Sequence, residues 1–303
     1  MAFTDASLTA LRVFREVAER GTLTAAAQAL GYTQSAVSRQ IASLERAAGT
    51  PLLERRHNGV TLTPSGHLVL RRAAAVVDQV DAATRELAGR PQEPRTVRLG
   101  WFPTAGAALV PRALAALRRT HPAITLITRE GSTPALVRAL RAGTVDLAML
   151  GSAPPFRAPD NETPPLDVRV LTERPLKVAV PATHPLAHHD SVTVDELHGQ
   201  RWIAVPNAGE DRFMGVWPGL DERPEIVHTV RDWLAKLSLV AAGAGITTVS
   251  DTLASVVPQG VRLLTVHGGP DEQRRTILAR LPRPLTEPVA QVAAALHSAA
   301  LEV

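Results

Sequence analysis

Four polar side chains that can hydrogen-bond to nucleic-acid bases recur on one side of residues 33–44. They are Gln34, Ser35, Ser38 and Arg39. Gln and Arg can form paired hydrogen bonds with the edges of adenine or guanine, and Ser can contact a base or a phosphate. Val37, Ile41 and Leu44 recur on the opposite side at helical spacing. Taken alone, the segment is more simply an amphipathic helix with an ordinary solvated face, so its interpretation depends on the surrounding elements.

Two other segments carry residue types found in cofactor or metal sites, and we discount both. Residues 243–248 (GAGITT) contain part of a dinucleotide-binding loop but lack its third glycine and a suitably placed acidic partner. Residues 184–190 (HPLAHHD) hold possible metal ligands, but the stretch contains proline and is typical of a surface loop. Nucleophile-elbow, phosphate-loop and zinc-peptidase motifs are missing. We therefore expect no catalytic residue, no metal and no cofactor, and a protein that is not an enzyme.

The composition excludes several classes of protein. With 303 residues, of which 45% are apolar, the chain is long enough for two or three domains. The absence of cysteine excludes disulfides, thiolate metal sites and thiol-based oxidant sensing. No membrane-length apolar run and no signal-peptide pattern occur, so we expect a cytoplasmic protein without a membrane partner. The net charge of +4 lies mostly in residues 1–95, where 12 basic residues face 9 acidic ones.

Residues 1–63 carry the pattern of a winged helix-turn-helix. Apolar residues at helical spacing predict a first helix that ends at Gly21. We expect Thr24 to cap a short second helix that ends at Gly31, and Thr33 to cap a third that ends near Gly49. Three short helices with glycine in the turn are typical of a helix-turn-helix. Alternating apolar residues around the Asn-Gly turn at 58–59 then predict a β-hairpin, the wing.

A long helix over residues 65–89 follows, and then the pattern changes. The long helix carries a short heptad seam that predicts a dimer contact, formed by Leu70, Ala73, Val77, Val80, Thr84 and Leu87. Residues 90–95 contain two prolines and predict a linker. From residue 96 onward, apolar strands alternate with helices, which favours an α/β domain with a mostly parallel sheet and a ligand site at the carboxyl ends of its strands.

These motifs closely resemble the LysR-type transcriptional regulators. The N-terminal resemblance is dense and ordered over residues 23–30 (LTAAAQAL), 33–41 (TQSAVSRQI), 44–45 (LE), 49–55 (GTPLLER) and 60–66 (VTLTPSG). A looser, collinear resemblance continues through residues 99–100 (LG), 143–148 (GTVDLA), 184–186 (HPL) and 240–246 (VAAGAGI). The resemblance implies a DNA-binding protein that responds to a small molecule.

For DNA binding, the resemblance implies that residues 33–44 enter the major groove. The residues expected to contact DNA are Thr24, Thr33, Gln34, Ser35, Ser38, Arg39, Arg55 and Arg56. Arg39 is expected to contact a base, and Arg56 a phosphate. Thr24 and the amides of the helix that follows could also hold a phosphate.

For the effector, the resemblance implies a cleft between two lobes. The residues expected to line it are Phe102, Thr104, Ser132, Thr133, Trp202, Pro206, Ile246 and Thr247. Hydroxyl groups and helix N-termini suit a polar or anionic ligand, and the aromatic residues could form apolar walls. The alternative is that Thr104, Ser132 and Thr133 only cap helices. An organic acid or an aromatic metabolite is the expected class of effector.

The resulting expectation is an α/β protein in three parts. Residues 1–64 form the winged helix-turn-helix, 65–90 the dimerisation helix and 91–303 a periplasmic-binding-protein-like domain. Its lobe I is expected at about 95–167 and 267–303, and its lobe II at about 168–266. A homodimer that assembles into a homotetramer on double-stranded operator DNA, with RNA polymerase as a possible partner, is the expected assembly. The competing classes are a solute-binding protein, which lacks a helix-turn-helix, and an α/β enzyme with an appended regulatory domain.

Overall fold

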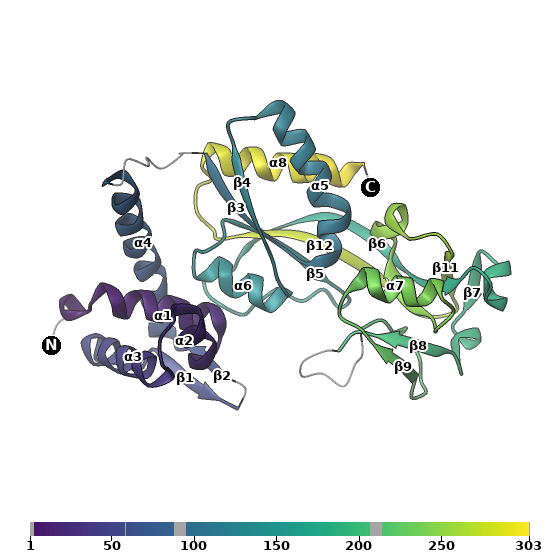
Figure 1. The fold of residues 1–303 in the computed structure, drawn as a ribbon, viewed down its shortest axis with the longest axis horizontal. Helices are drawn as coiled ribbons and strands as arrows, with labels where there is room; N and C mark the ends of the chain where they lie inside the picture. The colour runs from purple at the N-terminus through teal and green to yellow at the C-terminus, as the bar shows by residue number, and fades with distance from the viewer. Residues whose placement is uncertain (1–2, 58, 88–94, 207–213, 303) are drawn as a thin grey trace.

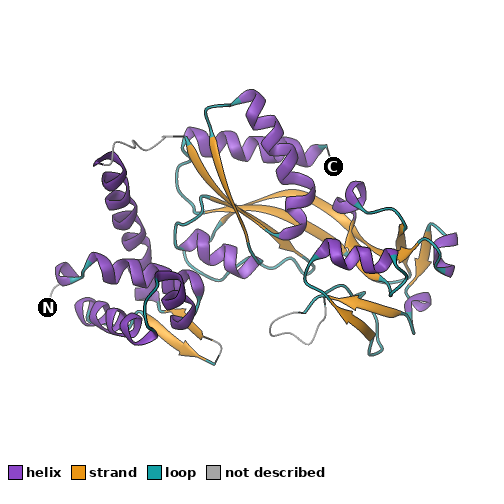
Figure 2. Ribbon diagram, viewed as in Figure 1, coloured by secondary structure: helices purple, strands orange, loops and turns teal. Residues whose placement is uncertain are grey.

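The N-terminal domain is a bundle of short helices with a β-hairpin at its edge (Figures 1 and 2). The computed structural model describes residues 3–57, 59–87, 95–206 and 214–302. The elements of this domain are the 3₁₀ helix η1 (Phe3–Asp5), α1 (Leu8–Arg20), α2 (Leu23–Leu30), α3 (Gln34–Ala48), β1 (Leu53–Arg56) and β2 (Gly59–Leu62). Phe14 and Val17 of α1 pack on Val37 and Leu44 of α3, all fully buried. The predicted winged helix-turn-helix is confirmed.

Helix α4 (Pro64–Leu87) leads away from this bundle, and its buried side faces α1. Leu70, Ala73 and Val77 are at most 3% exposed because they belong to the same core as α1. The expectation that Leu70, Ala73 and Val77 contact a second subunit is therefore wrong, whereas a dimer contact by Leu87 stays a prediction. Among the exposed apolar residues of α4, Leu68 and Val76 lie outside the seam, whereas Leu87 is a seam residue and is 90% exposed.

The C-terminal part is built on one long mixed sheet with the strand order β4-β3-β5-β12-β6-β11-β7, in which β10 also pairs with β6. At its lobe I end are β3 (Thr96–Trp101), β4 (Thr125–Glu130), β5 (Leu147–Ser152) and β12 (Gln273–Arg280). Helices α5 (Pro103–Thr120) and α8 (Glu287–Leu301) cover one face, and α6 (Thr133–Arg141) covers the other. The buried side chains of β5 alternate between these two faces: Leu147 and Met149 face α5, while Ala148 and Leu150 face α6.

Strand β6 (Asp167–Pro181) runs through both lobes. Residues 167–175 pair with β12, and residues 176–181 pair with β10 (Thr247–Ser250) and β11 (Val261–His267). Lobe II adds β7 (Ser191–Thr193), β8 (Arg201–Ala204), β9 (Glu225–Thr229), α7 (Trp233–Ala241), and the 3₁₀ helices η2 (Pro185–His188), η3 (Asp195–Leu197) and η4 (Asp251–Val256). The pairings of β12 with β5 and of β6 with its three neighbours are antiparallel. The expectation of a mostly parallel sheet is therefore wrong.

The long helices of the protein are amphipathic. Among the residues that the structure describes, no helix combines the length and the apolar character needed to cross a lipid bilayer.

Candidate DNA-binding surface and effector cleft

The turn between α2 and α3 is fixed by local hydrogen bonds. Gly31 ends α2 in the left-handed conformation, and its N–H donates to carbonyls of the last turn. Thr33 begins α3: its Oγ1 accepts a hydrogen bond from Ala36 N at 3.2 Å and lies 3.0 Å from Ser35 Oγ. The predicted cap at Thr33 is confirmed, and its hydroxyl is already used within the protein.

The outer face of α3 presents the polar residues that the sequence singled out. Gln34, Ser35 and Arg39 are exposed and Ser38 is half-buried. Within the described residues, the Arg39 guanidinium has no hydrogen-bond or ion-pair partner. Its charge is therefore available to a nucleic-acid ligand, and the four side chains point away from the core because Val37 anchors the opposite face.

Thr24 does not cap α2. The helix begins two residues earlier than expected, at Leu23, and Thr22 Oγ1 accepts the hydrogen bond from Ala25 N at 3.1 Å. Both threonines suit an N-cap by residue type, but only the residue directly before the first helical turn has the extended backbone that the cap requires. Thr24 is exposed in the first turn of α2, so its contact with a phosphate stays a prediction.

The wing is attached to the turn between α1 and α2. Val60 N donates to Gly21 O at 2.9 Å, and a Cβ built on Gly59 would lie only 2.3 Å from the same oxygen. At the tip, Arg56 is engaged: its Nη2 lies 2.6 Å from Glu54 Oε2 and its Nε donates to Thr61 Oγ1. Arg55 is exposed and has no such partner in the described part of the chain. Arg55 is thus the freer of the two predicted phosphate contacts.

The DNA-binding domain also packs against lobe I of its own chain, a contact that the sequence did not predict. Arg138 of α6 donates from Nε to Glu19 O at 3.0 Å, where α1 ends, and Arg129 of β4 forms an ion pair with the Glu19 carboxylate. Ala142, directly after α6, is buried in the core of the DNA-binding domain. Helix α6 therefore connects the two domains directly.

A second set of polar contacts joins α4 to the loop after β5. His67 Nδ1 lies 2.9 Å from Glu162 Oε2, and Arg141 of α6 binds Asp160 and Glu162 of this loop. Burial, followed by the charges of Arg141 and Arg71, lowers the pKa of His67. Burial also raises the pKa of Glu162. The contact therefore places ionisable groups where the domains meet.

The carboxyl ends of the lobe I strands form one wall of the expected cleft. Phe102, at the start of α5, lies near Gly151 at the end of β5, since a Cβ built on Gly151 would be 3.7 Å from its ring. Thr133, the first residue of α6, exchanges hydrogen bonds of 3.3 and 3.5 Å with the backbone of Gly151. Ser132 is the N-cap residue of α6, but its side chain forms no capping bond. Thr104 is half-buried in the first turn of α5.

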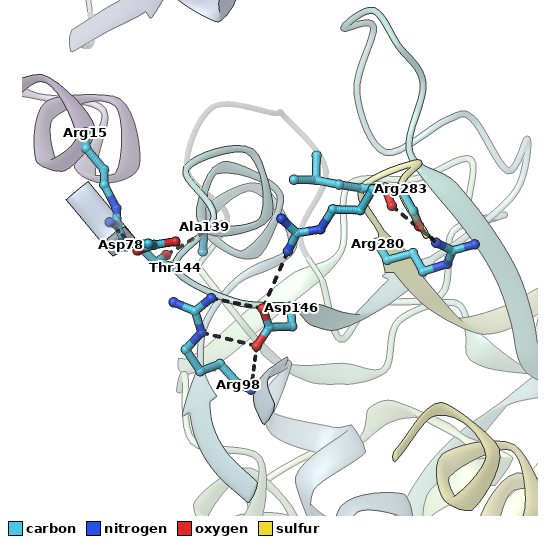
Figure 3. A network of polar contacts seen from close by, with 9 residues as sticks. Arg15, Asp78, Arg98, Ala139, Thr144, Asp146, Arg280 and Arg283 are labelled. Atoms are coloured by element: carbon cyan, nitrogen blue, oxygen red, sulfur yellow. Dashed lines mark hydrogen bonds and ion pairs between the residues drawn. The ribbon is translucent and has the colours of Figure 1, made fainter. Parts of the chain in front are cut away.

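The position of this wall depends on Asp146, within the family-like segment 143–148 (Figure 3). Its carboxylate accepts hydrogen bonds from Arg98 N, Nε and Nη2 at 2.9, 3.2 and 2.9 Å. Arg283 Nη2 lies 3.6 Å from the same carboxylate. Asp146 thereby fixes the start of β5 beside β3, which aligns Phe102 and Gly151 at the other end of these strands.

The predicted lobe II residues are mostly inside the lobe. Trp202 and Ile246 are 1% exposed in its apolar core. Thr247 is fully buried, with its Oγ1 2.8 Å from Ile203 O and 3.1 Å from Gly215 O. In this conformation these three side chains offer no surface to a ligand, because they pack inside lobe II. Only Pro206 is partly exposed. The expectation that the side chains of Trp202, Ile246 and Thr247 line the cleft is therefore not met in this conformation.

A winged helix-turn-helix joined by a long helix to a two-lobed α/β domain defines a transcriptional regulator with a ligand-binding domain. Family models agree: "LysR substrate binding domain" matches residues 90–300, and "Bacterial regulatory helix-turn-helix protein, lysR family" matches residues 8–67. The chain belongs to the LysR family of bacterial transcriptional regulators. It is a DNA-binding regulator with an effector-binding domain.

Individual proteins are similar over most of their length. The chain is 31% identical to the "Probable hydrogen peroxide-inducible genes activator" of Mycobacterium avium, covering 89% of this chain and 86% of the relative. It is 30% identical to the transcriptional regulator BenM of Acinetobacter baylyi, covering 81% of each. Among solved structures, a full-length OxyR variant from Pseudomonas aeruginosa has a TM-score of 0.58 at 22% identity, covering 97% of this chain and 94% of that one. Full-length CbnR complexed with its target DNA has a TM-score of 0.51 at 21% identity, covering 97% and 99%.

Proposed function

We propose that α3 binds the major groove of operator DNA and that Gln34, Ser35, Ser38 and Arg39 contact its bases. The observation that carries this proposal is the exposed polar face of α3, on which Arg39 has no partner among the described residues. An Arg side chain can hydrogen-bond to guanine O6 and N7 together, which is the commonest specific contact in the major groove. Arg55 on the wing, Arg56 beside it and Thr24 of α2 contact the phosphate backbone.

The protein acts as a dimer on a two-fold symmetric operator, and dimers assemble into a tetramer. The exposed side of α4 supports the dimer, because Leu68, Val76 and Leu87 are 52%, 47% and 90% exposed there. Exposed apolar residues at helical spacing are typical of a helix that pairs with another. We expect this assembly to work in the cytoplasm, where it would contact RNA polymerase at the operator.

The effector is a small molecule bound between the lobes. Phe102, Thr104, Ser132 and Thr133 supply an aromatic wall, hydroxyls and helix N-termini from lobe I, and the partly exposed Pro206 contributes an apolar contact from lobe II. This chemistry suits an organic acid or an aromatic metabolite. A cysteine-based response to peroxide is not available to this chain, because it contains no cysteine.

In-vitro selection of DNA with the full-length protein tests this function. We expect a two-fold symmetric site, bound by the wild type with nanomolar affinity and lost when both half-sites are scrambled. Fluorescence anisotropy with the selected site then compares the wild type with Arg39→Ala. Failure to enrich any sequence, or equal binding of selected and scrambled DNA, would contradict the proposal.

A further inference from the structure

Lobe II contains a buried lysine, Lys236 of α7, that the fold does not explain. The residue is 8% exposed, and its Nζ donates to Thr248 O at 3.3 Å. This is the only hydrogen bond or ion pair of the ammonium group among the residues that the structure describes. An ammonium group has three donors and a full charge, so its burial with a single carbonyl partner is costly. Desolvation lowers its pKa to about 8.

The other lysine of the chain shows the usual arrangement. Lys177 of β6 is 24% exposed and lies 2.9 Å from the carboxylate of Asp251. Lys236 has no equivalent carboxylate within the described part of the chain. Its neighbours on the buried face of α7 are apolar, and Leu237 and Val240 belong to a hydrophobic core.

The ammonium group of Lys236 lies at one edge of β10. Thr248 N donates to Gly215 O at 2.9 Å, and the N–H and C=O of a strand residue point to the same side. Thr248 O, and with it the ammonium of Lys236, is therefore on the edge of β10 that faces Gly215 rather than β6. Two further backbone hydrogen bonds lie in this part of lobe II. Val230 N donates to Ala204 O, and Val205 N donates to Met214 O.

Lobe I packs against this end of lobe II through α5. Ala108 of α5 shares one apolar core with Leu237 of α7 and Leu253 of η4. Thr104 precedes Ala108 by one helical turn on α5, so the N-terminus of α5 is directed toward the same region (Figure 1). The buried cation thus lies near the lobe boundary where the effector is proposed to bind.

We propose that Lys236 is the anchor for a carboxylate group of the effector, which makes this regulator selective for organic monocarboxylates. The inference rests on the proposed function, because it assumes that the effector binds between the lobes. A carboxylate that reaches Lys236 would supply the missing counter-charge, and a charge-assisted hydrogen bond in a buried site is strong. The neutral amide or alcohol with the same skeleton would leave the ammonium without its counter-charge.

Formate is a suitable probe, since the smallest carboxylate can enter a carboxylate subsite whatever the rest of the effector looks like. The melting temperature of the full-length protein is measured with sodium formate, with sodium chloride at the same ionic strength and with formamide. We expect formate to raise the melting temperature of the wild type above both controls. The formate-specific increase disappears in Lys236→Met and Lys236→Gln and is retained in Lys177→Met, the matched control.

For a larger carboxylate found to bind the wild type, Lys236→Met should weaken binding about 10- to 100-fold. Lys236→Gln guards against a packing defect, because its amide can still donate to Thr248 O. A formate effect that is equal in the wild type and in both Lys236 variants overturns the proposal, and so does the absence of such an effect in the wild type. Loss of the formate effect in Lys177→Met as well would also overturn it.

Two acidic residues outside the described part of the chain, Glu210 and Asp211, provide a further control. If Lys236 had one of them as a fixed partner, Glu210→Gln or Asp211→Asn would create a formate effect that the wild type lacks, and that outcome contradicts an effector role. Operator binding by Lys236→Met, measured by anisotropy, separates the two proposals. A wild type that binds the operator but shows no formate effect would reject the carboxylate anchor alone, whereas a wild type that binds no operator would reject the proposed function.

Discussion

Arg138 in the last turn of α6 donates a hydrogen bond from Nε to the main-chain oxygen of Glu19, 3.0 Å away at the end of α1. Carbonyls at a helix C-terminus lack partners within the helix, and a cation near them also interacts favourably with the helix dipole. An effector-domain side chain thus completes a helix of the DNA-binding domain. The other end of α6 carries Ser132 and Thr133, so a single helix links the proposed effector site to α1.

Replacing this side chain should loosen the contact between the domains. We expect Arg138→Met to increase amide hydrogen exchange at Gly21 and in α2, and to reduce the effect of a bound effector on operator affinity. Arg112→Met is the matched control, because Arg112 donates to Glu302 O at 3.2 Å wholly within the effector domain. Equal exchange changes in α2 for the two variants would contradict a coupling role for Arg138.

Arg39 should determine sequence preference. Arg39→Ala is expected to lower the affinity for the selected operator by about 1–3 kcal/mol, because a bidentate base contact is lost, and to relax the preference at one position of the site. Anisotropy against single-base variants of the operator measures both effects. The exposed Arg119 on α5 provides a control substitution to alanine. An unchanged preference at all positions would exclude a base contact by Arg39.

The wing arginines should act through phosphate. Arg55→Ala is expected to weaken binding to specific and scrambled DNA alike, and to reduce the slope of log K against log salt by about 1. We expect a smaller change for Arg56→Ala, since Glu54 already lies 2.6 Å from its guanidinium and offsets part of its charge. Binding isotherms at several salt concentrations provide the slopes. A slope that stays at the wild-type value in Arg55→Ala would remove that residue from the interface.

Gly59 should be essential for attachment of the wing. Its φ is +137°, and a Cβ would lie 2.3 Å from Gly21 O, so Gly59→Ala must shift the hairpin away from α1. We expect a loss of about 2 kcal/mol or more in the free energy of unfolding, measured with urea. Gly49→Ala, at φ +68° with nothing within 4 Å, should cost only about 1 kcal/mol. The same loss at both positions would mean that the contact with Gly21 is not the cause.

The buried Lys236 gives stability a specific pH dependence. Its pKa falls from the ordinary 10.5 to about 8, so the unfolded chain retains a proton that the folded chain has released between these values. The free energy of unfolding therefore rises with pH from about 8 to about 10.5. The shift corresponds to about 3 kcal/mol. At neutral pH, where both states are protonated, Lys236→Met should be more stable than the wild type by up to this amount.

This gain should shrink as the pH approaches 10.5, since the wild type no longer carries the buried charge there. All other ionisable groups are common to both proteins, so the difference between the wild type and the variant isolates Lys236. In Lys177→Met the rise with pH should persist. A constant difference between the wild type and Lys236→Met across this range would show that Lys236 titrates normally.

The DNA-binding domain could be predicted closely because its structure is set by local interactions. Gly21, Gly31 and Gly49 end their helices, and Thr33 caps α3, through hydrogen bonds that span only three or four residues. The one local error, Thr24 in place of Thr22, arises because both residues can serve as the same cap. The outward direction of Arg39 also follows from helical spacing, since Val37 and Ile41 must face the core.

The tertiary structure decided what depends on residues far apart in the chain. The heptad positions Leu70 and Val77 are buried against α1, and Trp202 fills the core of lobe II, although each pattern is equally compatible with an interface or a ligand wall. The bond between Arg138 and Glu19 spans 119 positions, and the burial of Lys236 depends on β10. Spacing along the sequence determines which face of an element is apolar, whereas the partner of that face, and the cost of a charge placed on it, are set by the elements that pack there.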